Sequence, residues 1–140
     1  MREILFRGKD ADNGEWVYGY YAHFKNMHDV KADIIYTGYA DMYMGSILPE
    51  CYDVNPKTIG QYTGLTDKNG KKIFEGDIVK YSEIDIDGSD DKYIGVIYYN
   101  QSKANYVIQK GKYMANFVTS WICDVEVIGN IYDNPELLEV

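Results

Sequence analysis

Cysteine is scarce in this chain of 140 residues, which holds only Cys51 and Cys123, far apart and in no C-x-x-C pair. A secreted domain of this size would usually carry more cysteines in a disulfide framework, so both are expected to be free thiols in a reducing compartment. No apolar run approaches the length of a membrane span, and the first residues lack the apolar core of a signal peptide. The sequence therefore predicts a cytoplasmic protein without structural disulfides.

Positive charge is also in short supply. The chain has 14 Lys and Arg against 22 Asp and Glu, which gives a net charge of −8. Proteins that bind nucleic acid by releasing counterions from phosphates usually carry a basic stripe. The charge balance therefore disfavours nucleic acid and anionic lipid as partners, although a local basic patch remains open.

Signatures of catalysis are missing as well. The chain contains no P-loop, no G-x-G-x-x-G, no G-x-S-x-G and no H-E-x-x-H. Its two histidines, His23 and His28, are five residues apart rather than the four of two ligands on one helix face, although paired strands could bring them together. Cys123 falls in an expected strand, where a thiol is usually inert. The serines without a nucleophile signature are Ser46, Ser82, Ser89, Ser102 and Ser120. No catalytic, cofactor-binding or metal-ligating residue is assigned, and a non-enzymatic protein is expected.

Carboxylates gather in "DIDGSDD", residues 85–91. An EF-hand loop needs glycine at its sixth position and a carboxylate at its twelfth, but counting from Asp85 these positions hold Asp90 and Val96. A solvated acidic loop is favoured over a loose calcium site. Glu75 and Asp77 would suit a glycosidase only if a cleft held them about 5–10 Å apart, so they are interpreted as turn residues.

The most patterned stretch, "GQYTGLTDKNGKKIFEGDIVK", runs from residue 60 to residue 80. Asp67 and Asn69 could offer oxygens to a cation. The tetrad D-K-N-G is more simply a turn, because aspartate bonds to backbone two residues on and Asn-Gly tolerates the left-handed conformation. We expect Gly70 at positive φ, Asp67 bonded to backbone within the turn, and little effect from Asp67→Asn.

Strand signals dominate the rest of the chain, in which 15 of 140 residues are tyrosine, a residue that favours strands. The expected strands are a hairpin over 2–24 with a type I′ turn at Asn13-Gly14, the flanks 59–65 and 71–74 of the D-K-N-G turn, and the runs 77–84, 93–100, 104–111 and 121–132. The sequence predicts an all-β fold of short strands and hairpins, with a small SH3-like barrel in the C-terminal half. A single domain, 1–140, is expected, with lobes at 1–60 and 61–140 as an option.

Three segments are less clear. Residues 25–50 look irregular apart from a strand over 33–37, and a helical turn before residue 33 stays open. Residues 117–128 have helical spacing, but their Val, Thr and Ile content favours strand. Near the end, Asn134 and Pro135 could cap one short helical turn.

Two tyrosine pairs, Tyr20-Tyr21 and Tyr98-Tyr99, place one ring on either face of a strand. We expect one ring of each pair to be buried and the other exposed. Exposed rings could stack on bases or anchor a protein partner, and the acidic balance favours the protein. A sheet surface stabilised by cross-strand aromatic pairs is the alternative.

Three blocks together carry a family resemblance: "ILFRGKDADNGEWVYG", "GQYTGLTDKNGKKIFEGDIV" and "EVIGNIYDNPELL". In this order, and over nearly the whole chain, they resemble the YopX-like family of phage and prophage proteins. The resemblance implies an all-β small-barrel fold and a gene carried by bacteriophages or prophages. It implies no biochemical activity and no catalytic residues. Residues 25–50 and the acidic loop, strongly acidic over 83–91, match no family pattern.

The sequence thus predicts a phage-encoded accessory protein that binds a host protein, a phage protein or itself through aromatic strand surface. The alternative is a protein that binds nucleic acid by stacking, or that mimics DNA. An enzyme with an unrecognised site is the third class, and it would need polar groups converging in a deep pocket.

Overall fold

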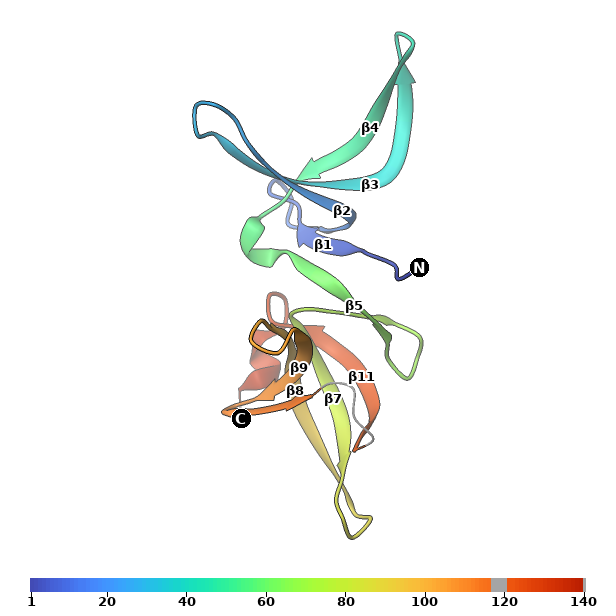
Figure 1. Cartoon of the computed structure of the whole chain (residues 1–140), viewed down its shortest axis with the longest axis vertical. Helices are drawn as coiled ribbons and strands as arrows, with labels where there is room; N and C mark the ends of the chain where they lie inside the picture. Colours follow the sequence, from blue (N-terminus) through green and yellow to red (C-terminus); the bar gives the residue numbers. More distant parts are fainter. Residues whose placement is uncertain (117–120, 140) are drawn as a thin grey trace. The chain divides into compact units, whose positions relative to one another are not determined.

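The structure is a computed structural model that describes residues 1–116 and 121–139, and antiparallel strands make up most of it (Figure 1). The all-β prediction is confirmed. The strands are β1 (Phe6–Lys9), β2 (Trp16–Lys25), β3 (Lys31–Tyr43), β4 (Ser46–Asp53), β5 (Gly60–Thr66), β6 (Lys72–Phe74), β7 (Asp77–Ile84), β8 (Asp90–Asn100), β9 (Asn105–Lys110), β10 (Tyr113–Asn116) and β11 (Ile122–Asn130). Two short 3₁₀ helices, η1 (Pro56–Thr58) and η2 (Pro135–Leu138), complete the described elements. The chain divides into two compact units, Met1–Tyr62 and Thr63–Val140.

The first unit is a sheet in which the strand order is β4-β3-β2-β1-β5. Val17, Ile35 and Val54 form its buried core, and Tyr21 and Ile59 pack against them. The predicted hairpin of β1 and β2 is present, but its connection is not a type I′ turn. The Asp10 N–H donates to the Glu15 carbonyl at 2.8 Å. A longer loop therefore joins the strands.

The expectation that residues 25–50 are largely irregular is wrong. They form most of the long β3–β4 hairpin, and no helical turn precedes residue 33. Met44 and Gly45, with φ of 48° and 79°, make the two-residue turn that a type I′ hairpin needs. A methionine rarely takes this conformation, so the dipeptide gave no turn signal in the sequence.

The second unit holds a five-stranded sheet in the order β10-β9-β8-β7-β11, and β6 pairs with the end of β5. Its core consists of Ile73, Val79, Tyr81, Ile97 and Ile108. The predicted SH3-like barrel is not confirmed, because neither sheet of the described residues closes on itself. β10 lies in a stretch that the sequence showed only as loose.

The D-K-N-G turn is as predicted at its centre. Gly70 has a φ of 81°, and the Oδ1 atom of Asp67 accepts from the N–H groups of Asn69 at 2.8 Å and Lys71 at 2.9 Å. The second carboxylate oxygen, Oδ2, accepts from the N–H of Val127, sixty residues away, at 3.0 Å. Asp67 therefore both shapes the turn and connects it to β11 by a hydrogen bond.

The C-terminal segment also follows the sequence in part. Residues 122–128 are strand rather than helix, while Phe117 and Ser120 lie outside the described residues. Pro135 begins the expected helical turn, but the side chain of Asn134 does not cap it. Instead, its Oδ1 atom accepts from the N–H of Asn130 at 3.3 Å.

The positive φ of Gly70 leads to a stability prediction. A Cβ added there would meet nothing within 4 Å, so Gly70→Ala should cost only the strain of an alanine at positive φ. This cost is on the order of 1 kcal/mol in the free energy of unfolding. Gly70→Asn should lose less, because asparagine tolerates left-handed geometry. Urea denaturation of the three proteins measures both values. Equal stability of native chain and Gly70→Ala would contradict the turn geometry.

Candidate functional site

The carboxylates that the sequence raised as ligands or acids serve the backbone. Asp77 is buried, and its Oδ2 atom accepts from the Phe74 N–H at 2.8 Å, which closes the turn around Gly76. Glu75 is half-buried beside it. Because Asp77 is used to cap the turn, the two do not form the facing pair that a glycosidase needs.

The acidic loop is a local turn as well. The Oδ1 atom of Asp87 accepts from both the N–H of Ser89 at 2.9 Å and its hydroxyl at 2.6 Å. Ile86 stands fully exposed at its tip. Within residues 1–116 and 121–139, no three His, Cys, Asp or Glu side chains are arranged to hold a metal ion.

The remaining candidates are scattered over the two units. His28 is exposed in the β2–β3 loop, Cys51 is exposed on β4, and Cys123 is half-buried on β11, both cysteines being free thiols. Ser82 is buried in β7. Of the other serines, Ser46, Ser89 and Ser102 are exposed, and Ser120 lies outside the described residues.

One polar cluster was not foreseen: Tyr21, His23 and Asp33, from the neighbouring strands β2 and β3. The Tyr21 hydroxyl donates to Oδ1 of Asp33 at 2.6 Å, and Nδ1 of His23 lies 2.7 Å from the same oxygen. His23 and Asp33 are directly opposed in the strand register. The sequence held no signal for this contact, because it depends on a hairpin that the sequence did not predict.

The electrostatics of this cluster suit a structural role. Burial, and then the bond to Asp33, raise the pKa of Tyr21 to about 12. Hydrogen bonds from Tyr21 and His23 lower the pKa of Asp33 below its ordinary value. The phenol therefore stays protonated and the carboxylate ionised at neutral pH, so Tyr21 is poorly suited to act as a base. A cross-strand polar pair of this kind stabilises the sheet.

An exposed surface with no structural role in the sheet lies on the far part of the β3–β4 hairpin, which we term the arm (residues 38–50). Figure 1 shows these strands extending beyond the other strands of their unit. Every residue of the arm is exposed. Its large apolar side chains include Tyr39, Met42, Tyr43, Met44, Ile47 and Leu48. Exposed apolar side chains that cluster in this way often mark interaction sites.

Strand register divides the arm into two unequal faces. The opposed pairs Ala40–Pro49 and Met42–Ile47 share one face, which is wholly apolar. Met42 is 67% exposed and Ile47 72% exposed. The opposite face mixes polar and apolar side chains, because Asp41 faces Leu48 and Tyr43 faces Ser46 across the strands. We call the first of these the apolar face of the arm.

Pro49 also marks the free edge of the sheet. β4 is the outermost strand of its sheet. Counting back from the two-residue turn, hydrogen-bonded and non-bonded pairs alternate, so Ala40–Pro49 is a non-bonded pair. The N–H of such a position points away from the paired strand, and proline has none. Pro49 therefore weakens edge-to-edge strand addition and leaves the apolar face as the better contact.

The tyrosine pairs agree only in part with the expectation. Tyr20 is exposed and Tyr21 half-buried, but Tyr98 and Tyr99 are both exposed, so the prediction is wrong for that pair. Tyr99 lies near the end of β8, beyond the core, where its ring packs edge-on against Tyr106 with centroids 5.2 Å apart. Strand alternation buries a ring only where a second layer covers it.

Comparison with known proteins finds one matching protein family and a similar solved structure. A family model described as YopX protein matches residues 5–139. The crystal structure of protein EF1440 from Enterococcus faecalis is similar, with a TM-score of 0.61 and 26% identity over 99% of this chain and 100% of that one. No curated protein matches. Among the described residues, no helix is long and apolar enough to cross a membrane.

The three bonds of Asp67 revise the expectation that Asp67→Asn changes little. The side chain of asparagine has only one acceptor oxygen, so its NH2 group would face a backbone N–H that then lacks an acceptor. We therefore expect a loss of about 1–3 kcal/mol in unfolding free energy at pH 7. Burial raises the pKa of Asp67, but the bonds from Val127, Lys71 and Asn69 outweigh it and leave the pKa lowered from 3.8. The stabilisation is therefore present above pH 3.8 and is lost as the pH falls through the lowered value.

Urea titrations of native chain and Asp67→Asn between pH 7 and pH 3 measure this difference. The control is Asp87→Asn, whose single accepting oxygen is retained by the amide, so it should leave no backbone N–H without an acceptor and should lose less stability at pH 7 than Asp67→Asn. Millimolar calcium should leave the melting temperature of the native chain and of both variants unchanged. A calcium-dependent rise in melting temperature that Asp67→Asn abolishes would mean that the turn is a cation site.

Proposed function

This chain belongs to the YopX protein family, and we propose that it works without catalysis, as a protein-interaction module whose contact is the arm. In this proposal the gene is carried by a phage or prophage, and the protein acts in the cytoplasm of a bacterial host. The family resemblance and the bacterial source of the similar crystal structure support that setting.

The apolar face of the arm carries the proposal. A two-stranded hairpin is marginally stable by itself, yet this one extends with every side chain in solvent. Burying one large apolar side chain stabilises a complex by about 1.5–3 kcal/mol. Burial of Met42 and Ile47 against a partner would thus contribute about 3–6 kcal/mol of binding free energy, before the cost of association is subtracted.

The charge of the arm narrows the partner. Asp41 and Glu50 are its acidic residues, and it has no Lys, Arg or His. Hydrogen bonds from the Thr37 hydroxyl at 2.6 Å and the Tyr52 hydroxyl at 2.7 Å lower the pKa of Glu50 and keep it ionised. The partner we propose therefore has an apolar patch with a basic or neutral rim. A nucleic acid fits this surface poorly, since phosphates would meet carboxylates.

Affinity capture with matched variants tests the proposal. Tagged native chain, the double variant Met42→Lys with Ile47→Lys, and a control, Ile86→Lys, are each incubated with lysate of an infected or lysogenic host. Ile86 is 99% exposed and lies in the second unit, so its substitution replaces one exposed apolar side chain by lysine away from the arm. Quantitative mass spectrometry should find a protein that native chain and control enrich equally and the double variant loses at least tenfold.

Sedimentation velocity of the purified proteins decides whether that partner is a second copy of this chain. All three should have the same melting temperature, because the substituted side chains are exposed. The proposal fails if the native chain enriches nothing and sediments as a monomer, or if the double variant keeps every partner of the native chain.

A further inference from the structure

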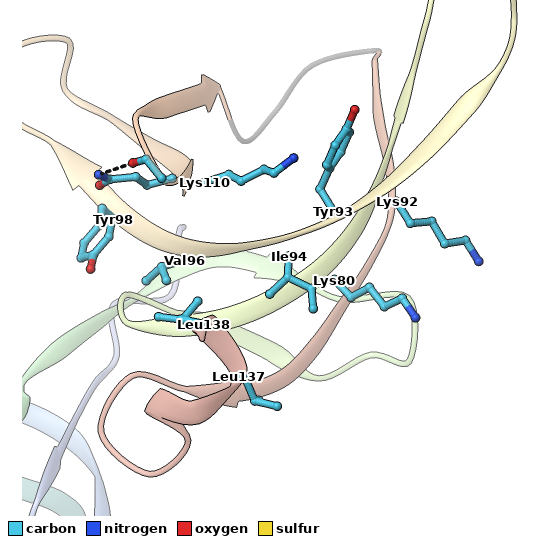
Figure 2. A pocket seen from close by; sticks show the side chains of 11 residues that line it. Lys80, Lys92, Tyr93, Ile94, Val96, Tyr98, Lys110, Leu137 and Leu138 are labelled. Atoms are coloured by element: carbon cyan, nitrogen blue, oxygen red, sulfur yellow. Dashed lines mark hydrogen bonds between the residues drawn. The ribbon is translucent and has the colours of Figure 1, made fainter. Parts of the chain in front are cut away.

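A second surface lies wholly within the other unit, in a hollow of about 760 Å³ on the sheet of β7, β8 and β9. Figure 2 shows Val96 and Ile94 of β8 pointing into it, with Leu137 and Leu138 of η2 on the side toward which they point. These four side chains give it an apolar floor. The hollow and its lining all fall within Thr63–Val140, so it is independent of the arm.

Strand alternation sets which groups share the face of that floor. Lys92, Ile94, Val96 and Tyr98 are alternate residues of β8, and Lys80 is opposed to Ile94 in the register of β7. The floor is therefore bordered by two ammonium groups at one end and by the Tyr98 ring at the other, as Figure 2 shows. The sequence hid this arrangement, because the two lysines are twelve positions apart on different strands.

The charges at the lysine end are only partly balanced. Within the part of the chain that the structure describes, neither Lys80 nor Lys92 makes an ion pair. Glu126 of β11 is opposed to Lys80 of β7, but the Glu126 carboxylate lies 3.3 Å from the ammonium of Lys68. Asp124 shares a smaller hollow of about 100 Å³ with both lysines. Lys110 also lines the main hollow, with its ammonium 3.6 Å from the centroid of the Tyr93 ring.

We propose that this hollow binds an acidic peptide segment of a protein partner, with branched apolar side chains on the floor and carboxylates at Lys80 and Lys92. Charge complementarity carries the assignment: two uncommitted ammonium groups gather beside apolar side chains on a protein whose net charge is −8. The proposal does not rest on the proposed function of the arm, and each can fail while the other holds.

The same lysines and Tyr98 could in principle meet a single strand of nucleic acid, but the lining favours the peptide. Sites that stack nucleotide bases combine several aromatic rings with a positively charged groove that follows the nucleic-acid backbone. Here the floor is Ile94, Val96, Leu137 and Leu138, which suit aliphatic side chains rather than base planes.

Fluorescence anisotropy of the full chain with a labelled probe tests the proposal. The probe is a nonapeptide of alternating aspartate and leucine, and its control carries lysine in place of aspartate. We expect saturable binding of the acidic probe below about 100 μM, a modest affinity in keeping with a small contact. Lys80→Glu with Lys92→Glu should weaken binding at least tenfold, as should Leu138→Asp. Lys103→Glu, on an exposed loop residue outside the hollow, should leave it unchanged.

Four results would overturn the proposal. They are no saturable binding of the acidic probe, equal binding of its lysine control, binding that the double lysine variant retains, or tighter binding of a labelled nine-residue oligothymidylate than of the peptide. The last would assign the surface to nucleic acid. Melting temperatures equal to that of the native chain establish that the variants are folded.

Discussion

The carboxylate of Asp67 accepts hydrogen bonds from three backbone N–H groups that belong to two separate segments of the second unit. Two of them shape the turn between β5 and β6, and the third, from Val127, belongs to β11. A second hydrogen bond joins the same two segments, since the Lys68 N–H donates to the Val125 carbonyl at 2.9 Å. The turn therefore holds β11 in its place beside β7, and the chain after β11 supplies η2 and the leucines of the apolar floor. A charged group buried in this way is stable only while all its donors are present.

Local chemistry explains what the sequence predicted well. The D-K-N-G tetrad, the turn at Gly76 and the helical turn at Pro135 each depend on side chains and backbone preferences within a few residues. The type I′ turn at Met44-Gly45 depends instead on the pairing of two long strands, which places a methionine at positive φ. For the same reason the bond from Val127 to Asp67 was missed, and with it the cost of an asparagine at that position.

The candidate surfaces were harder to predict than the strands. The apolar face of the arm follows from a register in which Met42 meets Ile47, and the lysine end of the hollow follows from one in which Lys80 meets Ile94. Composition does not hold this information. The net charge of −8 correctly describes the whole chain, but it does not reveal that Lys80 and Lys92 share one face and make no ion pair with any described residue. The two surfaces also differ in chemistry, since one is acidic and apolar and the other basic and apolar.

Site-specific photocrosslinking in living bacteria tests the central claim, that the arm is the contact of an interaction module. A photoreactive amino acid replaces Met42 in one protein and Ile86 in a second, both at exposed positions. The account predicts a discrete covalent adduct from position 42, with another protein or a second copy of this chain, and no such adduct from position 86. Irradiation that yields no discrete adduct from position 42, or the same adducts from both positions, would contradict it.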